Sequence, residues 1–240
     1  TAVDAIKLIG RLAEEFGYGD SGECITIADK KEVWQLEIFG SGAGKPSAIW
    51  VAQRIPDDHV GISANIPRIS KVNFNDPSNF MYSTDIKERC KKLGFWDGKE
   101  DFVFWKINNG SKPFAIRDYY VLSTLAPSLN LKFDAEELPF SVKPDKKVSV
   151  RDIIALYRQT YDGTEWVQTK NLSVEVTRRD RDRGEYKESV KPVSNFMTNE
   201  MRMLLNQLKP GVTERVRGIA VIQCSYSHII QLRDWLPDEV

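Results

Sequence analysis

Apolar residues recur at helical spacing through the first segment of the chain. Val3, Ile6, Ile9 and Leu12 lie about one helical turn apart, and the glycine-containing residues 17–19 follow. This pattern predicts a helix that ends near residue 16. The pattern then changes to short runs of β-branched and aromatic residues separated by polar or glycine-rich turns. These runs predict four strands of an antiparallel meander, at residues 24–29, 32–39, 48–54 and 60–65.

The stretch that follows, from residue 83 on, is predicted to be mainly helical. Ser149 and Asp152 have the spacing of a capping box ahead of an apolar run. Arginine and aspartate alternate within a stretch that we interpret as an exposed charged loop or insertion over residues 171–195, with a binding patch as the alternative. Because no break in composition divides the chain, residues 1–240 are expected to form a single domain. The remaining predicted elements are helices at 83–93, 102–107, 116–125 and 198–208, and a strand at 216–226.

Composition excludes several classes of function. The chain has 34 basic and 34 acidic residues, so we expect no general attraction to nucleic acid or to an anionic membrane. The three cysteines, Cys24, Cys90 and Cys224, are far apart and lack CxxC spacing, which indicates reduced thiols rather than a disulfide framework or a zinc site. With His59 and His228 as the sole histidines, neither a histidine-based triad nor a metal centre is expected, and no cofactor is predicted.

Two motifs with possible chemistry give no positive sign. Residues 40–45 form a glycine-rich run, but only three residues, not the four of a phosphate-binding loop, separate Gly40 from the Gly44-Lys45 pair. Pro46 follows instead of Ser or Thr, so the run departs from that motif. Several carboxylates lie in predicted turns, where only their spacing in the folded protein would decide whether they act as a glycosidase pair. They are Asp57, Asp58, Asp97, Glu100 and Asp101.

Asn65 is the strongest candidate site residue on the chain. It ends a predicted apolar strand just before Pro67, where regular pairing cannot continue. Its amide carries a pair of N–H donors that could stabilise an oxyanion, and loss of one such donor costs roughly 10²–10³-fold in kcat. The alternative is an asparagine that caps a turn.

Motifs spread along the chain resemble the dipeptidase A family of thiol-dependent, N-terminal-nucleophile hydrolases. The resemblance is weakest from 170 to 211. The matching motifs are ITIAD at 25–29 with EVW at 32–34, AIWVAQRIPD at 48–57, GISAN at 61–65, APSLNL at 126–131, LPFSVKPD at 138–145 and QLRDWLPD at 231–238.

The resemblance implies an α+β fold, an Ntn-hydrolase-like αββα sandwich of antiparallel sheets that this chain contains only in part. It implies hydrolysis of dipeptides by an N-terminal cysteine whose own α-amino group is the base. That cysteine would lie upstream of Thr1, so the chain would be the central segment of a larger enzyme and inactive alone. Thr1 itself begins a predicted helix, whereas the nucleophile of the family begins a strand.

Site residues carried over from the family are Asn65, as oxyanion donor, and Arg217, as an arginine near the nucleophile, with Arg215 competing for that role. A non-catalytic module that kept the fold and an amidase acting on N-acyl amino acids are the alternative functions. The compartment and a homo-oligomeric state stay open.

Overall fold

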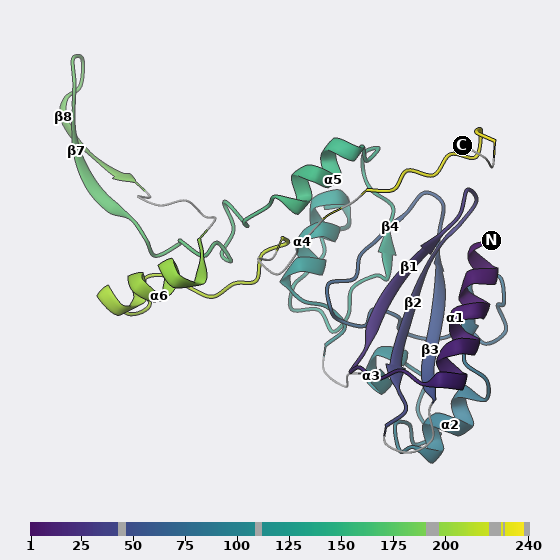
Figure 1. Ribbon diagram of the computed structural model, residues 1–240. Helices are drawn as coiled ribbons and strands as arrows, with labels where there is room; N and C mark the ends of the chain where they lie inside the picture. Colours follow the sequence, from purple (N-terminus) through teal and green to yellow (C-terminus); the bar gives the residue numbers. More distant parts are fainter. Residues whose placement is uncertain (43–46, 109–111, 191–196, 221–226, 228, 238–240) are drawn as a thin grey trace. The chain divides into compact units, whose positions relative to one another are not determined.

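The computed structural model describes residues 1–42, 47–108, 112–190, 197–220, 227 and 229–237 (Figure 1). The chain divides into two compact units, residues 1–148 with 229–240, and residues 149–228. Each combines helices with antiparallel strands, so the expected α+β class is confirmed. The expectation of a single domain over residues 1–240 stays a prediction.

The first unit is built on a four-stranded antiparallel sheet in the order β1-β2-β3-β5. The predicted hairpin forms as β1 (Glu23–Ala28) and β2 (Val33–Gly40), followed by β3 (Ala48–Ile55). In this register Cys24 lies opposite Glu37, and Glu37 lies opposite Val51. Directly opposed residues point to the same face of a sheet, so all three side chains share one face.

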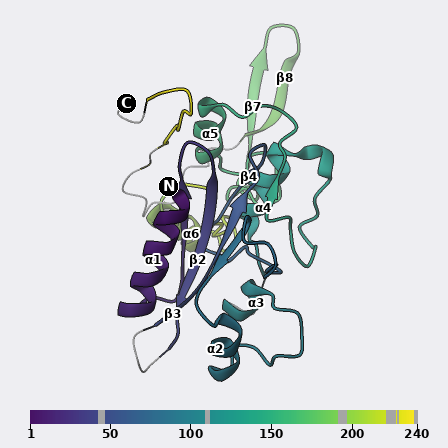
Figure 2. The ribbon, with the colours of Figure 1, turned by 90° about the vertical axis from the view of Figure 1, so that its right-hand side faces the viewer.

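Helices cover both faces of this sheet (Figure 2). The helix α1 (Ala2–Phe16) packs on the face that carries Trp34, Leu36 and Trp50. The opposite face carries Phe39, Ile49 and Val51 and packs against α2 (Ile86–Lys92) and α3 (Phe104–Asn108). Because both faces are covered, β2 and β3 are buried along most of their length, unlike strands with one solvated face.

The predicted fourth strand of the meander is wrong. Only β4 (Val60–Gly61) of that stretch is a strand, and it pairs with β6 (Ser141–Val142) in a separate two-stranded sheet. The fourth strand of the main sheet is instead β5 (Phe80–Tyr82). Residues 62–67 form no strand, and within them Asn65 has a left-handed backbone, with φ of 61°, and Pro67 cannot donate a ladder hydrogen bond.

A third cluster of side chains supports the smaller sheet. It includes Phe114, Leu122 and Val142 and joins β6 to α4 (Ile116–Leu125), which ends before a short 3₁₀ turn, Pro127–Leu129. The bounds of α4 agree with the predicted 116–125, whereas α2 begins three residues later than predicted.

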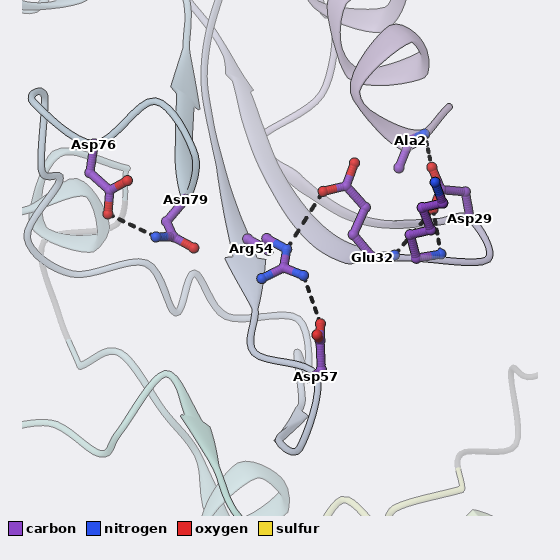
Figure 3. Close-up of polar contacts among 8 residues, drawn as sticks. Ala2, Asp29, Glu32, Arg54, Asp57, Asp76 and Asn79 are labelled. Carbon is purple, nitrogen blue, oxygen red and sulfur yellow. Dashed lines mark hydrogen bonds and ion pairs between the residues drawn. The ribbon is translucent and has the colours of Figure 1, made fainter. Parts of the chain in front are cut away.

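The turn between β1 and β2 is fixed by a carboxylate at the end of the sheet distant from Asn65. Asp29 accepts hydrogen bonds from the backbone N–H groups of Ala2, Lys31 and Glu32, at 2.8, 2.8 and 3.1 Å (Figure 3). Close by, Arg54 forms ion pairs with Glu32 at 3.5 Å and with Asp57 at 2.7 Å. These bonds join the start of α1 to the hairpin.

The second unit contains α5 (Val150–Tyr157), β7 (Val174–Asp180), β8 (Gly184–Val190) and α6 (Asn199–Leu208). The predicted capping box at Ser149 and Asp152 is confirmed. The charged segment within 171–195 forms a hairpin of β7 and β8 over its described residues rather than an irregular loop, and most of its side chains are exposed. Residues 216–220 of the predicted late strand are irregular, and 221–226 lie outside the described residues.

Membrane-spanning segments were sought among the described helices. None of these is both long enough and apolar enough to cross a bilayer.

Candidate active site

A cavity of about 540 Å³ opens beside the start of β1. Its wall comes from four segments that are distant in sequence but adjacent in the first unit. They are residues 20–24, Glu37 of β2, Ser63 with residues 65–67, and Asn108 at the end of α3. The cavity thus lies on the sheet face shared by Cys24 and Glu37.

Asn65 lies in the wall of this cavity and is exposed. Its left-handed φ of 61° is a conformation that asparagine adopts more readily than most residues. The Arg117 Nη1 group donates to Asn65 Oδ1 at 3.1 Å, and Arg117 Nη2 donates to the backbone oxygen of Ala64. The amide oxygen of Asn65 therefore faces Arg117, which leaves Nδ2 as the donor end of the side chain.

The thiol of Cys24 also lines the cavity, but its environment suppresses the thiolate. Burial raises the pKa of Cys24 to about 12, and the nearby carboxylates of Glu37 and Glu23 act in the same direction. A hydrogen bond with Ser63 opposes the shift without cancelling it. Burial likewise raises the pKa of Cys90, on α2, to about 11. The charge of Arg89 opposes the Cys90 shift without cancelling it, so neither thiol has the lowered pKa of a catalytic cysteine.

Glu37 is a buried carboxylate in the centre of the sheet that reaches the cavity wall. Burial raises the pKa of Glu37 to about 7, although several hydrogen bonds oppose that shift. Its Oε1 accepts from the backbone N–H of Arg68 at 2.6 Å and from Gln35 Nε2 at 2.8 Å, and Ile69 N–H donates at 3.2 Å. Glu37 therefore anchors the backbone that directly follows Asn65 to Pro67.

Arg68 and Asp118 continue this buried polar layer. Arg68 Nη1 and Nη2 donate to the carbonyl oxygens of Pro113 and Pro139, at 2.6 and 2.5 Å. Burial lowers the pKa of Arg68 and raises the pKa of Asp118, while their opposite charges act against both shifts. The layer ties the loop bearing Asn65 to the segments before α4 and before β6.

The histidine His59 and the carboxylates of the predicted turns form contacts within the fold. Ser141 Oγ lies 2.9 Å from His59 Nδ1, and Asp58 lies on the other side of the imidazole ring, so the residue types of a Ser-His-Asp triad are near one another. Asp58 is 3.8 Å from His59 Nε2, beyond hydrogen-bond range, and forms an ion pair with Lys143 at 2.9 Å. Asp97 accepts from backbone N–H groups of Lys99 and Glu100 in a turn, and Asp101 pairs with Lys71 at 2.5 Å.

Arg217 and Arg215 belong to the second unit, and both are exposed. The backbone oxygen of Arg217 accepts a hydrogen bond from the buried Tyr161 hydroxyl at 2.8 Å. The carry-over of Arg217 as a site residue stays a prediction. Cys224, His228 and residues 43–46 of the glycine-rich run lie outside the described residues.

Sequence reasoning did not identify Glu37 or Arg117 as neighbours of Asn65. For Glu37 a signal existed, because a carboxylate in the middle of the apolar run 33–39 is costly unless its burial is compensated. For Arg117 no local signal existed, since its partner is 52 residues away in the chain.

Comparison with known proteins assigns the chain, though not its site geometry, to a family. The profile of peptidase family C69 matches residues 1–240. A protein named "Probable dipeptidase" from Latilactobacillus sakei is 30% identical over 172 residues, 69% of this chain and 35% of that protein. A "Probable dipeptidase" from Salmonella dublin is 27% identical over 229 residues, 92% of this chain and 48% of that protein.

A "Probable dipeptidase B" from Streptococcus pyogenes serotype M1 is 24% identical over 227 residues, 91% of this chain and 43% of that protein. The chain thus spans about half the length, or less, of these relatives. The profile match over the whole chain confirms the resemblance seen in the motifs. The chain therefore belongs to peptidase family C69.

Proposed function

We propose that the full-length protein containing this chain hydrolyses dipeptides, and that the cavity beside β1 is part of its active site. The observation that carries the proposal is the Asn65 amide, exposed in the cavity wall with its oxygen held by Arg117 and its N–H₂ group left to donate. Such a donor can stabilise the negative charge that develops on a scissile carbonyl oxygen. The names of the C69 relatives support a dipeptide as the substrate.

The nucleophile in this proposal is an N-terminal cysteine outside these 240 residues. The raised pKa values of Cys24 and Cys90 support an external nucleophile, since a neutral thiol attacks poorly. The α-amino group of the nucleophilic cysteine takes the thiol proton as sulfur bonds to the carbonyl carbon, and returns it to the departing amine. Water then hydrolyses the thioester. An unperturbed α-amino pKa of about 7.7–8.0 suits this transfer near neutral pH.

The nucleophilic cysteine is expected to begin a strand outside these 240 residues. We propose that this strand pairs with β1 within an Ntn-hydrolase-like αββα sandwich. The support is that β1 pairs with β2 on one side and, among the described residues, forms no ladder on the other. Since Glu23 and Cys24 of β1 line the cavity, a strand bonded to that edge would run beside it.

Arg217 enters the proposal as a cation that lowers the pKa of the nucleophilic thiol, as the family resemblance implies. In the full-length enzyme, Arg217→Gln is expected to raise the pKa of the acidic limb of the kcat/KM profile, with Arg215→Gln as the matched control. An unchanged limb in Arg217→Gln and a shifted limb in Arg215→Gln would transfer the role to Arg215.

The experiment that tests the function compares the full-length protein with this 240-residue chain on a panel of dipeptides and N-acyl amino acids. We expect the full-length protein to cleave dipeptides, to be inactivated by iodoacetamide and to lose activity when its N-terminal cysteine is replaced. The chain alone is expected to show no turnover. Hydrolysis of N-acyl amino acids but not dipeptides would show an amidase, and inactivity on both substrate classes would indicate a non-catalytic module.

A further inference from the structure

Arg117 contacts both the side chain and the backbone next to the proposed oxyanion donor. Nη1 donates to Asn65 Oδ1 at 3.1 Å, and Nη2 donates to the Ala64 carbonyl oxygen. A guanidinium group carries donors and no acceptor. The Asn65 amide must therefore turn its oxygen toward Arg117, which directs Nδ2 away from it.

The guanidinium group also fixes the backbone at this position. Its donors form a rigid planar fork, so contacts to Asn65 Oδ1 and Ala64 O together restrict the peptide and the side chain to one arrangement. That restriction matters because Asn65 has a left-handed φ of 61°, which the chain does not hold by strand pairing.

The element that carries Arg117 is well anchored. Arg117 lies in the first turn of α4, where Asp118 Oδ2 accepts from the Ala115 N–H at 2.9 Å. Further along the helix, Leu122 is fully buried. A cation in the first turn is disfavoured by the helix dipole, so helix stability does not explain an arginine there. Arg117 instead contacts Ala64 and Asn65, and its charge also lowers the pKa of the neighbouring Asp118.

We propose that Arg117 is the positioning residue of the oxyanion donor, holding Asn65 so that Nδ2 points toward a substrate carbonyl in the cavity. The inference rests on the proposed function of Asn65. Arg117 acts through Asn65 and is not itself a donor to the substrate.

A double-mutant cycle in the full-length enzyme tests this role, with dipeptide hydrolysis measured for Arg117→Ala, Asn65→Gly and the double variant. Glycine keeps the left-handed backbone accessible and leaves no side chain for Arg117 to orient. We expect Arg117→Ala to lower kcat by about 10- to 100-fold, below the roughly 10²–10³-fold loss of the donor itself, with KM little changed. In the Asn65→Gly background, Arg117→Ala is expected to leave kcat unchanged.

The outcomes separate this inference from the function on which it rests. If Asn65→Gly leaves kcat unchanged, the proposed role of Asn65 fails. If Asn65→Gly lowers kcat but Arg117→Ala does not, or if the two losses multiply in the double variant, the positioning role alone is contradicted. A general loss of stability would lower kcat in both backgrounds, so it would not imitate the coupled result.

Two further variants serve as controls for the double-mutant cycle. Arg117→Lys keeps the charge but not the planar fork, and is expected to retain a kcat between those of wild type and Arg117→Ala. Arg54→Ala removes a matched arginine whose ion pairs with Glu32 and Asp57 lie near the turn between β1 and β2. It is expected to leave kcat unchanged, and a loss equal to that of Arg117→Ala would contradict the positioning role.

Discussion

Cys24 lines the cavity with a thiol that its surroundings keep protonated. Because its pKa is raised to about 12, the thiolate fraction near pH 8 is roughly a thousandfold lower than at the ordinary value of 9.0. We therefore expect iodoacetamide to label Cys24 in the folded chain far more slowly than in the denatured chain at that pH. Peptide-level mass spectrometry measures this. Equal rates in the two states would show that the site does not suppress the thiolate.

Glu37 makes the stability of the first unit depend on pH. Its pKa is raised from 4.5 to about 7, so between these values the folded chain holds a proton that the unfolded chain has lost. The free energy of unfolding therefore falls as pH rises through this window, and the contribution of Glu37 is fully present only below about pH 4.5.

Glu37→Gln removes this titration while it keeps an acceptor for the N–H groups of Arg68 and Ile69. We expect the variant to lose less stability than wild type between pH 4.5 and 7. Denaturant unfolding across that range, followed by the fluorescence of the buried Trp34 and Trp50, measures the difference. Parallel curves for the two proteins would contradict the raised pKa.

The sequence alone suggested Asn65 as a candidate donor but gave no sign of the groups that contact it. Its position before Pro67 and its residue type were sufficient to suggest a donor. Contacts such as Arg117 to Asn65 join residues far apart in the chain, so they depend on tertiary packing that no local pattern reveals. Arg217 lies in the second unit, and its role is still a prediction.

At the scale of elements, α1 and the β1–β2 hairpin followed directly from hydrophobic periodicity and turn residues. Strand β5 was missed because three residues are too few to show a period of two. The hairpin of β7 and β8 was missed because its strands are dominated by charged residues, which favour a loop in any reading based on hydrophobicity.

The packing of α1 on the sheet makes Gly10 intolerant of a side chain. A Cβ at this position would lie 2.3 Å from Trp50 Cζ2, and the indole is held in place by a 3.1 Å hydrogen bond to Glu14. Gly10→Ala is expected to destabilise the protein by about 1–3 kcal/mol, despite the better helix propensity of alanine.

Gly19→Ala is the matched control for this substitution, because an added Cβ meets no atom within 4 Å. Its effect is expected to stay within about 0.5 kcal/mol. Urea unfolding of both variants measures the contrast, and equal stabilities would contradict close packing of α1 on Trp50.

In the whole molecule, we expect the edge of β1 that forms no ladder among the described residues to pair with a strand of the full-length protein. Backbone N–H groups on that edge would then be hydrogen-bonded in the full-length protein and solvated in the 240-residue chain. Hydrogen exchange of residues 23–28 is expected to be slower in the full-length protein. Residues 51–53 of β3, already paired with both β2 and β5, serve as the control. Equal exchange of β1 in both proteins would contradict the added strand.

The most direct test of Asn65 as the oxyanion donor is the kcat of the full-length protein carrying Asn65→Asp. Aspartate keeps the size of the side chain, its tolerance of a left-handed backbone and an oxygen for Arg117, but it lacks the N–H₂ donors. We predict that kcat for dipeptide hydrolysis falls by about 10²–10³-fold while KM changes little. A kcat within about twofold of wild type would show that Asn65 is not the oxyanion donor.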